Sequence, residues 1–278
     1  MVDGDKSSPQ PSSPDQARRS RVQSVDRALD ILEALAACGR DGLSLAALAR
    51  ELGTSKSTAL ALVRTFVARG FVAEIGTGRM RRYRLGLALA RLGDEALSQI
   101  SVLDIALPSL RAMTDETGWT SRIGVLDEGY AVMIGRVDGP GIVRFQSNLA
   151  RRELPHCSAI GKALLANLNV DRVREIVERT GLPGRTATTI TNLADLLREL
   201  EDVRARKYAI DNEEDSEGVF CVGAAVYDHR EACVAGISVT GLKTTLPPGG
   251  IEGLGAVVRR YAASISHGLG AELPALSL

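Results

Sequence analysis

The chain has 278 residues, of which 45% are hydrophobic and 4% aromatic, and its formal net charge is zero. This length allows about two domains, and the apolar fraction is that of a globular protein. No stretch approaches the roughly 20 apolar residues that a membrane span needs, so we expect no membrane partner. The four cysteines are widely spaced and form no C-x-x-C pair, which indicates reduced thiols and a cytoplasmic protein.

Charge is unevenly distributed along the chain. Residues 16–95 carry 14 Lys and Arg against 8 Asp and Glu, whereas residues 96–278 carry 19 against 23. A basic first part and an acidic second part indicate that one domain faces a polyanion and the other does not. Residues 1–19 are rich in Ser, Pro, Asp and Gln and lack both apolar periodicity and the features of a secretory signal. We expect a disordered tail there.

Two short helices around a tight turn are predicted over residues 43–70. A helix that opens at Ser24 is expected to pack behind them. Ser44 is a candidate cap for the first short helix, Gly53 suits a left-handed turn, and Thr54 or Ser55 would cap the second. This spacing is typical of a helix-turn-helix, although a helical hairpin inside a protein core shares it.

The second short helix has one apolar and one polar side. Its predicted core face consists of Leu60, Val63, Phe66 and Val67. The opposite side carries polar residues that would reach base edges and flanking phosphates, namely Lys56, Ser57, Thr58 and Arg64.

A β-hairpin is predicted directly after this helix, with strands at 70–74 and 80–85 and its tip at 76–79. Its returning half contains Arg79, Arg81, Arg82 and Arg84. A hairpin in this position is a wing, and its guanidinium groups would meet DNA phosphates or the minor groove. Charge on an exposed edge strand also prevents aggregation, and both roles are compatible. We therefore expect residues 20–85 to form a winged helix-turn-helix DNA-binding domain, with Arg79, Arg81 and Arg82 on the DNA backbone.

Residues 86–100 predict a strongly apolar helix that links two domains. Such a helix must bury its apolar face, either against a partner chain or against its own domain. The first choice gives a homodimer or a dimer of dimers.

Residues 101–272 predict a second domain with an antiparallel sheet covered by helices. Strands are expected at 120–126, 130–137, 142–147, 219–226 and 232–240, and helices at 103–117, 159–168, 170–180, 193–206 and 250–267. Because the strands meet through hairpins and the helices are grouped between them, the fold class is α+β rather than a doubly wound sheet.

Three segments carry a resemblance over nearly the whole chain, from about Arg21 to Gly270. They are S-V-D-R-A-L-D-I-L-E-A-L at 24–35, L-P-H-C-S-A-I-G-K-A-L-L-A at 154–166, and Y-A-I-D-N-E-E-D-S-E-G-V-F-C-V-G-A-A-V-Y-D at 208–228, which continues into V-A-G-I-S-V-T-G at 234–241. With the winged helix-turn-helix between the first two, the chain resembles the IclR family of bacterial transcriptional regulators. The resemblance implies an operator-binding domain, a dimerising linker helix and a GAF-like (profilin-like) domain that binds a small effector.

The effector site can be argued partly from the residues themselves. Backbone N–H groups at the helix start after His156-Cys157-Ser158 would suit a carboxylate, although a helix capped by Ser158 explains the same residues. The family resemblance places effector contacts at Ala159, Ile160, Asp211, Val219, Cys221, Ser238 and Thr240. Phe145, on the third strand, is expected to form the floor of this site. Such a lining suits a small organic acid or another polar metabolite.

Metal binding and catalysis are not predicted. The acidic residues at 211–217 match no ordered calcium loop, and a solvated acidic turn explains them better. Ser158, His156 and Asp211 could be arranged as a hydrolase triad, but no G-x-S-x-G elbow is present. The chain is therefore expected to be a transcriptional regulator with no cofactor. The alternatives are a ligand sensor that acts through protein contacts and, less favoured, a serine hydrolase.

Overall fold

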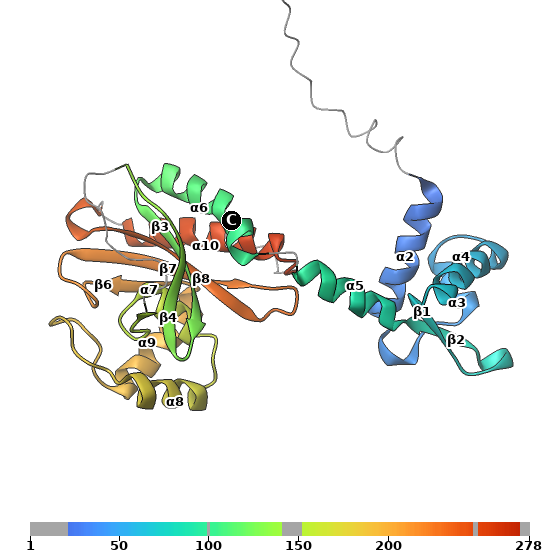
Figure 1. The fold of residues 1–278 in the computed structure, drawn as a ribbon, viewed down its shortest axis with the longest axis horizontal. Coiled ribbons are helices and arrows are strands. Elements are labelled where there is room, and N and C mark those ends of the chain that lie inside the picture. Colours follow the sequence, from blue (N-terminus) through green and yellow to red (C-terminus); the bar gives the residue numbers. More distant parts are fainter. Residues whose placement is uncertain (1–21, 99–100, 141–151, 247–249, 273–278) are drawn as a thin grey trace, which may run out of the picture. The chain divides into compact units, whose positions relative to one another are not determined.

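The structure is a computed structural model that describes residues 22–98, 101–140, 152–246 and 250–272. The chain divides into two compact units, residues 1–99 and 100–278 (Figure 1). The third predicted strand at 142–147, together with Phe145, lies outside the described residues.

The first unit contains the predicted helices and hairpin. Its elements are α2 (Gln23–Ala37), η1 (Gly39–Asp41), α3 (Leu45–Glu51), α4 (Lys56–Ala68), β1 (Val72–Ile75), η2 (Gly78–Met80), β2 (Arg82–Leu85) and α5 (Leu87–Ser98). The Ser44 and Ser55 hydroxyls cap α3 and α4 by accepting hydrogen bonds from the backbone N–H groups of Ala47 and Thr58. Gly53 adopts a φ of 55°, so the predicted left-handed turn is confirmed.

Two local predictions in this unit were wrong. Helix α2 begins at Gln23, and the residue before it is Val22, so Ser24 lies inside the helix and does not cap it. In α4 the predicted core residues Val63, Phe66 and Val67 belong to the core of the unit, but Leu60 is only half-buried and the fully buried Ala59 was not predicted. Ala59 precedes Val63 by four residues and so shares its buried side of the helix, while Leu60 lies about 100° further round.

The second unit contains a six-stranded antiparallel sheet and five α-helices in its described part. The helices are α6 (Val102–Thr117), α7 (Ala159–Leu165), α8 (Val170–Thr180), α9 (Leu193–Arg206) and α10 (Gly250–Gly268); η3 (Lys243–Thr245) follows the last strand. The strands are β3 (Thr120–Asp127), β4 (Tyr130–Val137), β5 (Arg152–Glu153), β6 (Ala209–Asn212), β7 (Val219–Tyr227) and β8 (Cys233–Leu242). Their order in the sheet is β5-β4-β3-β8-β7-β6. The two edge strands, β5 and β6, were not predicted from the sequence.

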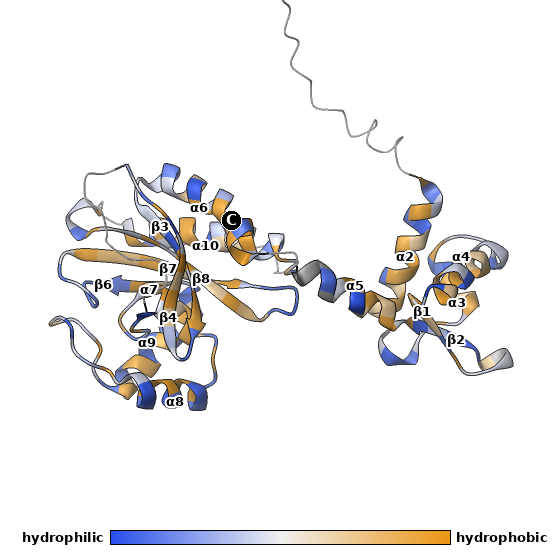
Figure 2. Cartoon of the chain, viewed as in Figure 1, coloured by the Kyte–Doolittle hydropathy of each residue, from blue (hydrophilic) through white to orange (hydrophobic). Residues whose placement is uncertain are grey.

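Helices cover both faces of this sheet (Figure 1). Helices α6 and α10 pack on one face, where Ile123, Phe220, Val222, Ile237 and Val239 form the main core with them. Helix α7 packs on the other face, and α8 and α9 form a further apolar cluster with it. Accordingly, β7 and β8 are largely hydrophobic in Figure 2, whereas α8 combines hydrophilic and hydrophobic residues. The predicted α+β class is confirmed.

Among the described residues, no helix is both long enough and apolar enough to cross a membrane.

Candidate functional site

The exposed side of α4 is the candidate DNA-binding surface of the first unit. The side chains of Lys56, Ser57, Thr58 and Arg64 are all exposed, the first three of them in the first turn of the helix, while Ala59 and Val63 are fully buried. The hydroxyl of Ser55 lies 2.8 Å from that of Ser57 and 2.9 Å from that of Thr58. These contacts hold the first turn of α4, so the exposed polar residues of that turn have fixed positions.

The hairpin of β1 and β2 is attached to the helices by main-chain pairing. Leu43 and Tyr83 exchange two backbone hydrogen bonds of 2.8 Å, and the buried Tyr83 side chain packs into the core of the unit. The arginines of the wing differ in their surroundings. The Arg82 guanidinium donates to the carbonyl of Gly42 through Nε (3.2 Å) and Nη2 (2.9 Å), whereas Arg81 only approaches the exposed Glu74, at 3.7 Å. Arg82 thus uses part of its hydrogen-bonding capacity within the unit. The Arg79 side chain lies outside the described part of the structure.

In the second unit, the predicted effector residues converge on one face of the sheet. Strand register places Asp211, Cys221, Thr240 and Thr120 side by side across β6, β7, β8 and β3. The next row on the same face holds Gly223, Ser238 and Arg122. Helix α7 covers this face: a Cβ atom on Gly223 would lie 3.0 Å from the carbonyl of Ala159. The predicted residues from α7, β6, β7 and β8 are therefore brought together, with Ala159, Ile160, Asp211, Cys221, Ser238 and Thr240 all buried and Val219 half-buried.

A buried ion pair that was not predicted lies on the same face. Arg122 Nη1 donates to Oε1 of Glu153 at 3.1 Å, and both side chains are at most 9% exposed. Arg122 Nη2 is also 3.7 Å from Sγ of Cys221, which in turn accepts a hydrogen bond from the Thr240 hydroxyl at 3.3 Å. The alternation of side chains along β3 could have predicted that Arg122 lies on the same face as Thr120. Its partner Glu153 could not have been predicted, because it lies 31 residues away on a strand of only two residues.

Asp211 holds the turn that follows β6. Its Oδ1 accepts hydrogen bonds from the backbone N–H groups of Glu214 (2.8 Å) and Asp215 (3.3 Å). Burial raises the pKa of Asp211 to about 7; the N–H of Glu214 acts in the opposite direction, and the charge of Glu214 reinforces the rise. Burial likewise raises the pKa of Cys221 far above its ordinary value, so this thiol stays protonated at neutral pH.

The acidic segment 211–217 is not the solvated turn that the sequence predicts. Asp211 and Glu214 are buried, Asp215 pairs with Arg185 at 2.7 Å, and Glu213 pairs with Lys243. Hydroxyl groups of Thr186, Thr188 and Thr189 donate to the carbonyls of residues 212–214 and hold the segment in place. Within the described ranges, no group of three or more His, Cys, Asp or Glu residues could bind a metal ion.

His156 and Ser158 are not arranged as a catalytic pair. The Ser158 hydroxyl accepts from the N–H of Gly161 at 3.1 Å and caps α7. His156 Nε2 lies 3.3 Å from the carbonyl of Pro183, and its Nδ1 has no partner among the described residues. Burial lowers the pKa of His156, so its ring is neutral at physiological pH. Neither ring nitrogen activates the Ser158 hydroxyl.

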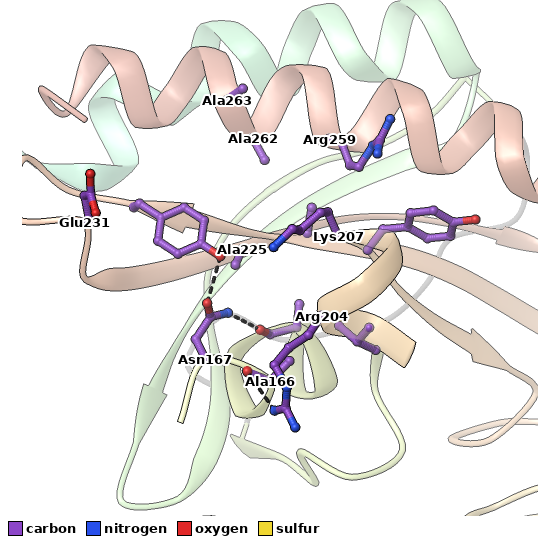
Figure 3. Close-up of a pocket in the computed structure, with 14 residues that line it drawn as sticks. Ala166, Asn167, Arg204, Lys207, Ala225, Glu231, Arg259, Ala262 and Ala263 are labelled. Atoms are coloured by element: carbon purple, nitrogen blue, oxygen red, sulfur yellow. Dashed lines mark hydrogen bonds between the residues drawn. The ribbon is translucent and has the colours of Figure 1, made fainter. Parts of the chain in front are cut away.

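A separate pocket of about 340 Å³ lies between α7, α9, β7 and α10 (Figure 3). Its walls include Ala166, Val203, Ala224 and Ala262, with none of the predicted effector residues among them. The Arg204 guanidinium turns to the carbonyl of Ala166, at 3.1 Å, and Figure 3 shows that it does not point toward Arg259. The guanidinium groups of Arg204 and Arg259 therefore do not converge on one point.

Comparison with known proteins identifies the protein family to which each of the two units is similar. The model of the IclR helix-turn-helix domain matches residues 24–76, and that of the bacterial transcriptional regulator IclR C-terminal domain matches residues 94–267. The chain belongs to the IclR family. Relatives include the transcriptional repressor AllR of Klebsiella pneumoniae, 31% identical over 90% of each chain. Another is the regulator KdgR of Dickeya chrysanthemi, 34% identical over 79% of this chain and 70% of the relative.

Solved structures of IclR-family proteins share the fold. The repressor BlcR of Agobacterium tumefaciens has a TM-score of 0.76 with 28% identity, over 90% of this chain and 98% of that one. The IclR protein of Thermotoga maritima has a TM-score of 0.59 with 30% identity, over 89% and 98%. The protein is thus a DNA-binding transcriptional regulator with an IclR C-terminal domain, from a family of regulators rather than enzymes.

Proposed function

We propose that this IclR-family regulator binds near-palindromic operator DNA through α4 and the wing, and that a small carboxylate-bearing effector bound to the second unit modulates this binding. The exposed polar side of α4, opposite a fully buried Ala59 and Val63, carries the DNA-binding part of the proposal. A helix presented in this way fits the major groove, and a trailing hairpin reaches the adjacent backbone. Lys56, Ser57, Thr58 and Arg64 contact bases and phosphates, and Arg79, Arg81 and Arg82 contact the backbone.

Salt-dependent binding to DNA from upstream of the gene tests this assignment. Fluorescence anisotropy at several salt concentrations gives the slope of log K against log salt. Each phosphate interaction that a substitution removes lowers the steepness of this slope by about one. Lys56→Ala and Arg64→Ala are expected to weaken binding, whereas Arg172→Ala, an exposed arginine of α8, is the matched control. Binding that is absent at low salt, or unchanged in both α4 variants, would contradict the proposal.

The effector part of the proposal is supported by the residues on the α7 side of the sheet. Hydroxyls from Ser238 and Thr240, the Cys221 thiol and the Asp211 carboxyl share this face, with Ala159 and Ile160 against it and Val219 at its margin. An effector shifts DNA binding only if it has different affinities for the DNA-bound and free conformations. Ser238→Ala is therefore expected to leave operator affinity intact and to abolish the response to effector.

Self-association is part of the same proposal, as a homodimer or a dimer of dimers. In the first unit, α2 exposes Val25 and Leu29, Val22 just before it is also exposed, and α5 exposes Leu87 to 88%. Exposed apolar side chains mark an interaction surface where they form a contiguous patch. Leu87→Glu is expected to lower the oligomeric mass in sedimentation equilibrium without loss of helical signal. An unchanged mass would exclude α5 from the interface.

A further inference from the structure

One edge of the Arg122 guanidinium, formed by Nε and Nη2, has no oxygen acceptor among the described residues. We call it the open edge; it lies in the interior of the second unit. Its residue is only 8% exposed, so nearly the whole side chain is removed from solvent. Nη1 donates to Glu153, while Nη2, among the described residues, contacts only the sulfur of Cys221, at 3.7 Å. Nε has no hydrogen-bond partner among the described residues. A buried donor without a partner is rare in folded proteins and calls for an acceptor.

Ser238 supplies a second unpartnered group next to this edge. Its hydroxyl is fully buried and has no partner in the described part of the chain. Arg122 and Ser238 are directly opposite each other in the β3–β8 register, so their side chains leave the sheet on the same face. Two unsatisfied groups on neighbouring strands therefore mark one place, and that place adjoins Cys221 and Thr240.

The shape of the open edge selects the chemistry of an acceptor. Nε and Nη2 lie on the same side of the planar guanidinium and donate in parallel, a geometry that matches the two oxygens of a carboxylate. Glu153 does not compete for this edge because it binds Nη1. Instead, Glu153 fixes the plane of the guanidinium, so the Nε–Nη2 edge is preorganised.

Arg122 keeps its positive charge in this buried position. Burial alone lowers the pKa of Arg122, but the negative charges of Glu153, Asp211 and Asp215 outweigh this effect, so the net shift of the pKa is upward and the side chain stays charged. The other buried cation on this side, Lys162, pairs with two carboxylates, Glu199 and Glu214, at 3.1 and 2.6 Å, whereas Arg122 pairs with one. A buried carboxylate requires a charged partner with free donors, and Arg122 meets that requirement.

We propose that Arg122 anchors the carboxylate of the effector through Nε and Nη2, that the Ser238 hydroxyl donates to the same carboxylate, and that Glu153 positions the guanidinium. This inference rests on the proposed role of the second unit as the effector domain, and it makes Arg122 a determinant of specificity. The effector is then a small organic acid, and its acidic group lies against β3 and β8 rather than at the start of α7. Uncharged analogues of the same size are rejected because they cannot pair with the guanidinium.

Isothermal titration calorimetry on the full-length protein tests this inference without DNA. The probes are pyruvate and succinate, with succinamide as the uncharged analogue and inorganic phosphate as a different oxyanion. The double variant Arg122→Gln/Glu153→Gln removes both charges together, so no unpaired buried charge remains. Arg152→Gln, in the neighbouring exposed ion pair with Glu128, is the matched control. Circular dichroism confirms that each variant is folded.

At least one of the two acids is expected to bind the wild type, while succinamide does not bind. The double variant should weaken this binding by about 10- to 100-fold, the range expected for loss of charge-assisted hydrogen bonds, and Arg152→Gln should leave it unchanged. Should the double variant fail to fold, Arg122→Lys replaces it: lysine keeps the charge but lacks the planar fork, and about tenfold weaker binding is expected.

The inference is overturned if neither acid binds the wild type, if succinamide binds equally well, if phosphate alone binds, or if the folded Arg122 variant binds the acid as tightly as the wild type. Operator binding measured on the same preparations keeps the two proposals distinguishable. A protein that binds DNA but fails these titrations refutes only the role of Arg122. A protein that binds the acid through Arg122 but ignores its upstream DNA refutes the proposed function instead.

Discussion

The Lys162 ammonium lies 2.6 Å from Oε1 of Glu214 inside the second unit, and only 1% of the lysine side chain is exposed. The same Nζ is 3.1 Å from Glu199 of α9, which also pairs with Arg206. Burial raises the pKa of Glu214, and the positive charge of Lys162 opposes that rise. One lysine of α7 thus connects the helix, α9 and the acidic segment that follows β6.

Replacement of Lys162 by Met tests the importance of this connection. The variant leaves Glu214 buried without a countercharge, and removal of one partner of a buried pair costs about 3–5 kcal/mol of unfolding free energy. Urea denaturation measures the loss. The control is Arg198→Ala, which breaks an exposed pair with Asp195 and is expected to cost less than about 1 kcal/mol. Equal losses in the two variants would show that the buried pair has no structural role.

Asp211→Asn is expected to change the pH dependence of stability. The pKa of Asp211 is about 7 in the folded protein and near 3.8 in the unfolded chain. The folded state therefore binds more protons between these values, so ionisation of Asp211 lowers stability as the pH rises through this window. Asparagine keeps the Oδ1 acceptor for the N–H groups of Glu214 and Asp215 but has no proton to lose.

The advantage of the Asn variant over the wild type should consequently grow from about pH 4 to about pH 8, by an amount of the order of 4 kcal/mol. Chemical denaturation of both proteins at several pH values measures this difference. A constant difference across the window would mean that Asp211 is already ionised near its ordinary pKa.

Local signals explain why the first unit is predictable from its sequence. The caps Ser44 and Ser55 and the left-handed Gly53 act within three or four residues of their own position, and the structure contains all three. Edge strand β5 has two residues, too few to show alternation, so the sequence holds no sign that Glu153 is buried.

Arg122 illustrates a second limit of sequence reasoning. It lies between Ser121 and Ile123 in a strand, and an arginine in such a position is normally assigned to solvent. Its burial depends on Glu153, 31 residues away, and on the β3–β8 register that brings it to Ser238. Neither the ion pair with Glu153 nor the pairing with Ser238 produces a recognisable pattern in the sequence around Arg122. Both depend on how distant strands pair in the sheet.

The two neighbouring arginines of the wing are expected to behave differently. Arg81→Ala removes a side chain with one weak ion pair, so stability should stay within about 0.5 kcal/mol while the salt slope of DNA binding falls by about one. Arg82→Ala also removes two charged donors from the carbonyl of Gly42, which should lower the unfolding free energy by about 1–2 kcal/mol. Denaturation and anisotropy on both variants separate these effects. Equal stability of the two variants would show that the Gly42 contact is unimportant.

Gly161→Ala should destabilise the second unit because α7 approaches the preceding loop too closely for a methyl group. A Cβ atom at this position would lie 2.4 Å from both Cα and the carbonyl oxygen of Pro155, and backbone atoms cannot move aside as a flexible side chain can. We expect a loss of about 1–3 kcal/mol, the usual cost of overpacking. Gly253→Ala in α10 is the matched control, since nothing lies within 4 Å of its Cβ position.

In that control the higher helix propensity of alanine should raise stability by about 0.5–1 kcal/mol. Opposite signs for the two substitutions, measured by thermal and urea denaturation, are the expected result. A displaced α7 would also move Ala159 and Ile160 away from the β7–β8 face, so Gly161→Ala should weaken effector binding even where the protein remains folded. A Gly161→Ala variant as stable as the wild type would show that the loop at Pro155 can yield to α7, and the close packing of this helix on the sheet would then not depend on glycine.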